Sequence, residues 1–284
     1  MKRSDIAADF ASEIADKDSF KQNHYTSHGI SVTKIDIDTE KAAKAFSKPM
    51  GSYITVSPLH NWHIHRNDAM DTAKAICGEL IPLLPKNGTV LIVGLGNAAL
   101  TADNIGPCTA SKIIATRHLK EKMPDNFIDF HSVAAIAPGV LGVTGIETGE
   151  IVKGVAEKIK PSAVIAVDAL STSECENLCR TFQIANTGIV PGSGVGNFRF
   201  ALTEETLGVP VIAVGVPTVL DTGEMINEIL YSHGLKNADF ELPLSVTPKD
   251  IDVLSEKSSN VIACAINMAL HEKIDAKELM EFMA

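Results

Sequence analysis

The sequence lacks an excess of positive charge. Its 284 residues include 25 lysines and arginines against 35 aspartates and glutamates, which gives a formal net charge of −10 at pH 7. This balance argues against a broad nucleic-acid-binding surface, because such a surface needs many cations to neutralise the phosphates. We therefore expect no direct contact with nucleic acid.

Long hydrophobic runs are also absent. An apolar stretch such as residues 209–220 is interrupted by glycine and proline, and it is shorter than the roughly 18 residues of a membrane-spanning helix. The N-terminal segment carries Asp5 and Asp9, so it cannot serve as the apolar region of a signal peptide. These absences predict an intracellular protein that does not bind a membrane.

Cysteines are few and follow no metal-binding pattern. There are five, an odd number, and only Cys175 and Cys179 lie close together in the sequence. A zinc site would need further cysteine or histidine ligands at short spacing, and none flanks this pair. Three histidines cluster around the single tryptophan, Trp62, where we expect an exposed loop and not a scaffold for metal ligands. The sequence predicts free thiols and no metal site.

The apolar pattern of the chain changes near residue 88. Before it we expect a helix in the first twenty residues, strands at 30–37 and 52–56, and an amphipathic helix at 68–84. After it, strands are expected at 89–93, 130–136, 163–167 and 210–214, and helices at 108–121, 150–159, 203–207, 247–271 and 275–282. Such alternation is typical of a mostly parallel sheet that helices cover on both faces. We predict a three-layer α/β fold, with residues 1–284 forming one domain.

Two aspartates lie where such a sheet binds its ligands, beyond the carboxyl ends of the strands. Asp103 follows the strand at 89–93 after a short loop, and Asp168 directly follows the strand at 163–167. If these strands are neighbours, the two carboxylates converge and resist ionising together, so that they share a proton. Such a pair can take a proton from water and give one to a leaving group, which is the chemistry of peptide hydrolysis. The alternative is structural: Asp103 caps the next helix and Asp168 caps a turn.

Two glycine-rich segments are further candidates for binding. Residues 94–99 fit a permissive dinucleotide fingerprint, but the acid expected about twenty residues further on is missing. Residues 191–197 lack the Lys-Ser/Thr pair of a phosphate-binding loop, and their backbone amides could form an oxyanion hole or merely a tight loop. The residues of this possible substrate-binding or oxyanion loop are Gly192, Ser193, Gly194, Gly196 and Asn197.

Taken together, these segments resemble the germination protease family of spore-forming bacteria. The resemblance covers most of residues 88–270, whereas the first 60 residues match poorly apart from Lys48-Pro49 and Tyr53. Among the stretches that match in the family's order are Val93-Gly-Leu-Gly-Asn97, Thr101-Ala-Asp-Asn-Ile-Gly-Pro107, Thr144-Gly-Ile-Glu-Thr148, Val167-Asp-Ala-Leu170 and Pro191-Gly-Ser-Gly-Val-Gly-Asn197.

The resemblance implies a fold similar to that of the hydrogenase maturation endopeptidases, and an endopeptidase without a cofactor. The family's two catalytic aspartates fall on Asp103 and Asp168 of this sequence. The family degrades small acid-soluble spore proteins in the cytoplasm (spore core) during germination. It is made as a homotetrameric zymogen that removes its own N-terminal propeptide.

The family cleaves after an acidic residue that is followed by a bulky apolar residue and alanine. The Asp5–Ile6 bond matches the family's processing site, which makes residues 1–5 the expected propeptide. The Asp9–Phe10 bond resembles the sequence cut in spore proteins and could extend the propeptide to residue 9. Recognition of an acidic side chain requires a nearby cation. By charge alone, the candidates are Arg117, Arg199 and Lys112.

Two other functions are compatible with the same residues. The Gly-x-Gly-Asn and strand-Asp-Ala arrangement is similar to that of hydrogenase maturation endopeptidases, where acids and a histidine hold nickel of the partner. A histidine would have to complete such a site here, and the spacing identifies none. The other alternative is a non-catalytic nucleotide-binding module that uses residues 94–99.

Overall fold

One mixed β-sheet forms the centre of the protein. The computed structural model describes residues 4–11, 14, 16–59, 62–190, 200–235, 244–275 and 279. Within these residues, nine strands form one sheet in the order β1-β2-β3-β7-β8-β6-β4-β5, with β9 paired to β8. The parallel half comprises β4 (Thr89–Gly94), β5 (Ser132–Ile136), β6 (Ala163–Thr172) and β8 (Val211–Asp221). The antiparallel extension comprises β1 (Lys21–Ser27), β2 (Ile30–Ile37), β3 (Gly51–Ser57), β7 (Phe182–Ala185) and β9 (Ser245–Val246).

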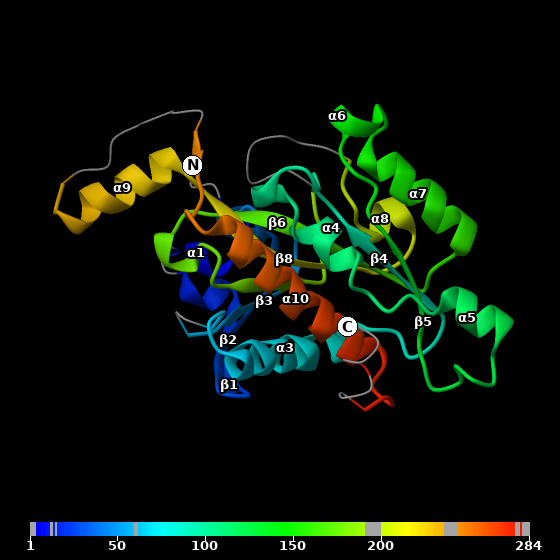
Figure 1. Cartoon of the computed structure of the whole chain (residues 1–284). Coiled ribbons are helices and arrows are strands. Elements are labelled where there is room, and N and C mark those ends of the chain that lie inside the picture. Colours follow the sequence, from blue (N-terminus) through cyan, green and yellow to red (C-terminus); the bar gives the residue numbers. More distant parts are fainter. Residues whose placement is uncertain are drawn as a thin grey trace.

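Helices cover both faces of this sheet (Figure 1). On one face, α3 (Arg66–Leu80), α4 (Ile105–Ala110) and α10 (Ile251–Leu270) pack together. On the other face, α7 (Thr148–Ile159) and α8 (Glu204–Leu207) cover the parallel half, and α1 (Ala8–Ala11) and α2 (Glu40–Phe46) cover the antiparallel extension. The other helices are α5 (Arg117–Lys122), α6 (Leu141–Thr144) and α9 (Thr222–Ser232). The prediction of a three-layer α/β fold is confirmed.

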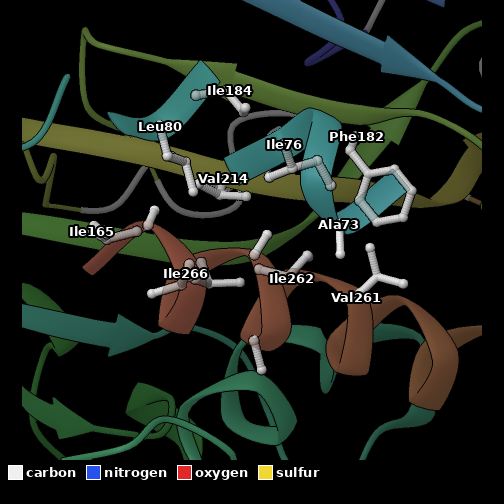
Figure 2. Packing of buried hydrophobic residues seen from close by; sticks show 14 of the residues in the cluster. Ala73, Ile76, Leu80, Ile165, Phe182, Ile184, Val214, Val261, Ile262 and Ile266 are labelled. Atoms are coloured by element: carbon white, nitrogen blue, oxygen red, sulfur yellow. The ribbon is translucent and has the colours of Figure 1, made fainter. Parts of the chain in front are cut away.

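The largest group of buried apolar side chains lies between the sheet and the helices α3 and α10 (Figure 2). Ile165 of β6 belongs to it, together with Ile76 of α3 and Ile266 of α10. The neighbouring Val164 belongs to a second group on the opposite face, which includes Val152 of α7. Because successive side chains of a strand point to opposite faces, β6 is buried on both sides, as its continuous apolar run predicts.

Two of the predicted helices differ from those in the structure. The expected helix at 108–121 is divided into α4 and α5, because Thr116 bonds to the sheet between them. The N–H of Thr116 donates to the carbonyl of Val133 over 3.0 Å, and its hydroxyl donates to the carbonyl of His131. Within the described part of the first twenty residues, only α1 and a 3-10 turn at Lys17–Ser19 are helical. The single helix predicted there is therefore wrong.

The two central strands are longer than their apolar runs. The strand predicted at 163–167 extends to Thr172, and the strand predicted at 210–214 extends to Asp221. Asp168 therefore lies within β6 and not after it. The helix predicted at 275–282 falls almost entirely outside the described residues. Among the helices that the structure describes, none is both long and apolar enough to cross a membrane.

The backbones of three segments meet where β4 ends. A Cβ atom added at Gly94 would lie 2.2 Å from the carbonyl oxygen of Gly106. One added at Gly106 would lie 2.2 Å from the carbonyl oxygen of Leu95 and 2.4 Å from that of Val167. These separations are far below van der Waals contact with backbone atoms that cannot rotate away, so neither position accepts a side chain.

We expect Gly106→Ala to destabilise the protein by about 3 kcal/mol or more, because the added methyl group overpacks a junction of three backbones. Gly154→Ala in α7 is the matched control, since a Cβ there would meet nothing within 4 Å. That change should stabilise by about 0.5–1 kcal/mol through helix propensity alone. Denaturant unfolding of the two variants measures both values, and equal stability of the two would contradict the close packing.

Candidate active site

Asp168 is a buried acid on a central strand of the sheet. Val164 and Ala166, four and two residues before it on β6, pack with Val152 of α7. Strand alternation therefore directs the Asp168 side chain toward the same face. Only 6% of Asp168 is exposed, and its Oδ1 accepts the N–H of Ala169 over 2.9 Å.

Asp103 lies in a 3-10 turn, η3 (Thr101–Asp103), between β4 and α4. Its Oδ2 accepts the N–H of Asn97 over 2.8 Å, which closes the loop that follows β4. The hydroxyl of Thr218 on β8 donates to the carbonyl of Ala102 over 2.6 Å. On the other side, Ser255 of α10 donates to the side chain of Asn104. These contacts hold η3 between β8 and α10.

The segments that carry the two aspartates are in direct contact. β4 and β6 are parallel neighbours, with Gly94 opposite Val167. The N–H of Leu95 donates to the carbonyl of Val167 over 2.8 Å, and α4 approaches the same carbonyl through Gly106. The neighbouring strands on which the predicted pair depends are therefore present, and both acids lie at the end of the sheet where β4 stops.

Asp168 belongs to a row of four residues that pair in register across four neighbouring strands. They are Asp168 on β6, Gly215 on β8, Gln183 on β7 and Thr55 on β3. Neighbouring strands are about 4.8 Å apart, which places the backbones of Asp168 and Gln183 about 10 Å from each other. Gly215 has no side chain, and the side chain of Leu170 lies against it: a Cβ atom added at Gly215 would lie 2.7 Å from Cγ of Leu170.

A cavity of about 260 Å³ lies over Gly215 and Gln183 of this row, on the face that carries α1, α2 and α8. Leu170, Gln183 and Gly215 contribute to its floor, and Lys48 and Asp5 contribute to its wall. Gly215, which pairs with Asp168 in the sheet, and the N-terminal segment of the chain therefore line the same cavity.

The N-terminal segment is bound to the end of β6. The N–H of Asp5 donates to the carbonyl of Ser171 over 3.0 Å. The Asp5 carboxylate accepts the N–H of Ser171 over 2.8 Å and its hydroxyl over 3.1 Å. Ile6 is fully buried, and the N–H of Ala7 donates to Oε1 of Gln183 over 3.2 Å.

Asp9 fixes the start of α1 to the residues that follow β6. The side chain is fully buried, and its Oδ2 accepts the hydroxyl of Ser4 over 2.5 Å and that of Thr172 over 2.8 Å. The same oxygen accepts the N–H and the hydroxyl of Ser173, each over 3.1 Å. The amide of Asn177 donates to Oδ1 over 2.7 Å.

Two of the three cations considered from the sequence, Arg117 and Lys112, lie elsewhere, and a lysine that was not considered lies beside Asp5. Arg117 pairs with Glu121 of its own helix over 2.9 Å, and Lys112 donates to Ser259 of α10 over 2.9 Å. Lys48 Nζ donates to the carbonyl oxygen of Asp5 over 2.9 Å. Burial lowers the pKa of Lys48, while the charges of Asp5 and Asp9 act to raise it. Its isolated match to the family in the N-terminal region was the one signal that could have identified it.

Some of the predicted site residues lie outside the described residues, and other predictions concern the cysteines and metal ions. Gly192, Ser193, Gly194, Gly196 and Asn197 lie outside the described residues, as does Arg199. All five cysteines lie within them, and none of the five forms a disulfide. In the part of the chain that the structure describes, no three His, Cys, Asp or Glu side chains are grouped so that they could hold a metal ion.

We expect Asp9→Ala to destabilise the protein by about 3 kcal/mol, because it leaves the buried donors of Thr172, Ser173 and Asn177 without their acceptor. Asp18→Ala is the control, since Asp18 is an exposed aspartate of the same N-terminal region. It should change stability by less than about 0.5 kcal/mol. Chemical denaturation checks both, and a harmless Asp9→Ala would show that these bonds do not anchor α1.

Comparison with known proteins identifies relatives along most of the chain. A family model described as Germination protease matches residues 3–241. The germination protease of Clostridium perfringens (strain 13 / Type A) is 41% identical over 287 residues, covering 89% of this chain and 88% of that protein. The germination protease of Caldanaerobacter subterraneus subsp. tengcongensis is 40% identical over 288 residues, covering 90% and 89%. That of Geobacillus sp. (strain WCH70) is 35% identical over 314 residues, covering 87% and 84%.

Among solved structures, a NiFe hydrogenase maturation protease, HycI from Thermococcus kodakarensis KOD1, aligns with 66% of this chain and 98% of its own. The two are 19% identical, with a TM-score of 0.35. The family model and the curated relatives, in contrast, match over most of the chain at 35–41% identity. The chain belongs to the germination protease family.

Proposed function

We propose that this peptidase of the germination protease family is an endopeptidase made as a zymogen, with Asp103 and Asp168 as its catalytic pair. It processes itself at the Asp5–Ile6 bond, which makes residues 1–5 a propeptide within the single domain of residues 1–284. Its substrates are small acid-soluble spore proteins in the cytoplasm (spore core), and it acts as a homotetramer. The assignments of the substrates, the location and the homotetramer rest on the family resemblance.

The proposed chemistry is the hydrolysis of an amide by two carboxyl groups that share one proton. The ionised carboxylate takes a proton from water, and the water oxygen bonds to the carbonyl carbon of the peptide. The bond between carbon and nitrogen then breaks, and the protonated carboxyl group gives its proton to the nitrogen. The products are a carboxylic acid and an amine. Burial of Asp168 supports such sharing, because low dielectric disfavours two adjacent negative charges.

One observation carries this proposal. The loop of Asp103 and the strand of Asp168 meet at the carbonyl of Val167, beside a cavity that Asp5 and Gly215 both line. Gly215 stands opposite Asp168 in the sheet. These connections between the loop of Asp103, the strand of Asp168 and the N-terminal segment support the proposal.

The structure favours Asp5–Ile6 over Asp9–Phe10 as the processed bond. Asp5 precedes α1 and lines the cavity, so its peptide lies outside the helix and on the side of the proposed site. Asp9–Phe10 lies within α1, and the Asp9 carboxylate is fully buried among its own hydrogen-bond partners. Cleavage there would require α1 to unfold first.

We expect Asp103→Asn and Asp168→Asn each to slow the release of residues 1–5 by at least about 100-fold, because each removes one member of the proton-sharing pair. Mass spectrometry of the purified full chain over time measures the appearance of a chain that begins at Ile6. Far-ultraviolet circular dichroism confirms that the variants fold.

Asp129→Asn is the matched control for this experiment. Asp129 is an exposed aspartate whose contact is an ion pair with Lys273, over 3.6 Å, on the surface. This variant should process at the rate of the unchanged chain. Release of residues 1–5 from folded Asp103→Asn or Asp168→Asn at an undiminished rate would end the proposed mechanism.

A further inference from the structure

Lys48 is held in place by the end of α2 and by two aromatic rings. It follows α2, whose last turn closes through Ser47 in the left-handed conformation and through the N–H of Lys48 bonded to the carbonyl of Ala43 over 3.1 Å. Its Nζ lies 5.8 Å from the ring centroids of both Phe10 and Tyr53. A cation between two aromatic faces is attracted to both and loses much of the freedom of an exposed lysine.

The ammonium group of Lys48 points at backbone carbonyls of the N-terminal segment. Nζ lies 2.9 Å from the carbonyl oxygen of Asp5 and 3.3 Å from that of Ser4. Under the proposed function, the Asp5 carbonyl belongs to the bond that is cleaved. Lys48 is therefore a donor on the oxygen that becomes negative when water adds to that carbonyl.

The carboxylate of the same residue is recognised separately. It accepts both the N–H and the hydroxyl of Ser171, a serine of β6 of which only 3% is exposed. Two donors from one buried residue favour an ionised carboxylate over a neutral side chain of the same shape. Asp168 lies three residues earlier on the same strand.

We propose that Lys48 and Ser171 form the subsite for the residue on the amino side of the cleaved bond. Ser171 selects an acidic side chain there, and Lys48 stabilises the carbonyl oxygen as it becomes an oxyanion. This deepens the proposed function and rests on it. The subsite holds Asp5 of its own chain before processing, and it takes the acidic residue of a substrate after residues 1–5 have left.

Lys48 exchanges no atom in this step. Water still supplies the new oxygen, and the carboxyl pair still moves the proton from that water to the departing nitrogen. The N–H of Lys48 only shortens its contact as charge builds on the oxygen. A preorganised donor of this kind acts on the transition state more than on the ground state, so its loss lowers kcat more than it raises KM.

The test uses the full chain and, as a substrate, a synthetic peptide that spans residues 1–11. In Lys48→Met we expect the release of residues 1–5 to slow by about 100-fold. Once that release is complete, kcat for the peptide should be lower by about the same factor, with KM nearly unchanged. Lys48→Arg should recover part of the rate. The matched control is Lys44→Met, an exposed lysine of α2 that should process normally.

Ser171 is tested by selectivity and not by rate alone. The unchanged enzyme should cleave the peptide at least about tenfold faster than the same peptide with Asp5→Asn, because hydrogen bonds to a charged group exceed those to a neutral one. Ser171→Ala should bring this ratio toward one, mainly through a higher KM for the acidic peptide. This second readout keeps the proposal testable if Lys48→Met does not fold.

The outcomes separate the two proposals. If the unchanged chain neither releases residues 1–5 nor cleaves the peptide, the proposed function falls, and the subsite falls with it. If cleavage depends on Asp103 and Asp168 but folded Lys48→Met retains its kcat, Lys48 is no part of the site. An unaltered ratio between the two peptides in Ser171→Ala overturns the role of Ser171 and leaves the catalytic pair intact.

Discussion

The close contact between the backbones of Gly94 and Gly106 at the end of β4 is the constraint on which the rest of the site depends. Gly94 and Gly106 have no room for a Cβ atom, because the start of α4 presses against the carbonyls of Leu95 and Val167. This contact lets β4, its loop and β6 share one end of the sheet at backbone distance. Without it, the loop that carries Asp103 would be separated from β6 by the width of at least one side chain.

The end of β6 serves two purposes within a few residues. Asp168 contributes the buried acid, and Ser171 and Thr172 bind the carboxylates of Asp5 and Asp9. The N-terminal segment is therefore tied to the strand that carries the proposed chemistry. Removal of residues 1–5 would leave α1 anchored through Asp9 and would empty the recess that Asp5 occupies. This arrangement gives a physical reason why such a short segment can control access to a site.

The sequence predicted the parts of the fold that repeat a simple pattern, and it missed those that depend on distant polar contacts. The apolar runs located β4 and the first half of β6 because strands buried on both faces contain few polar residues. The later part of β6 contains Asp168 and Ser171, so hydropathy ended it too early. Thr116 divides the predicted helix at 108–121 by bonding to β5, and Lys48 reaches Asp5 from 43 residues away. Neither partner can be found from local spacing.

In the proposed mechanism, two carboxyl groups meet over the bond between Asp5 and Ile6. A crystal structure of the uncleaved Asp168→Asn chain measures this most directly, because the substituted side chain keeps its shape and the N-terminal segment stays intact. We expect side-chain oxygens of residues 103 and 168 to lie within about 6 Å of each other and to face the carbonyl carbon of Asp5. Side chains on opposite faces of the sheet, or a carbonyl far from both, would contradict it.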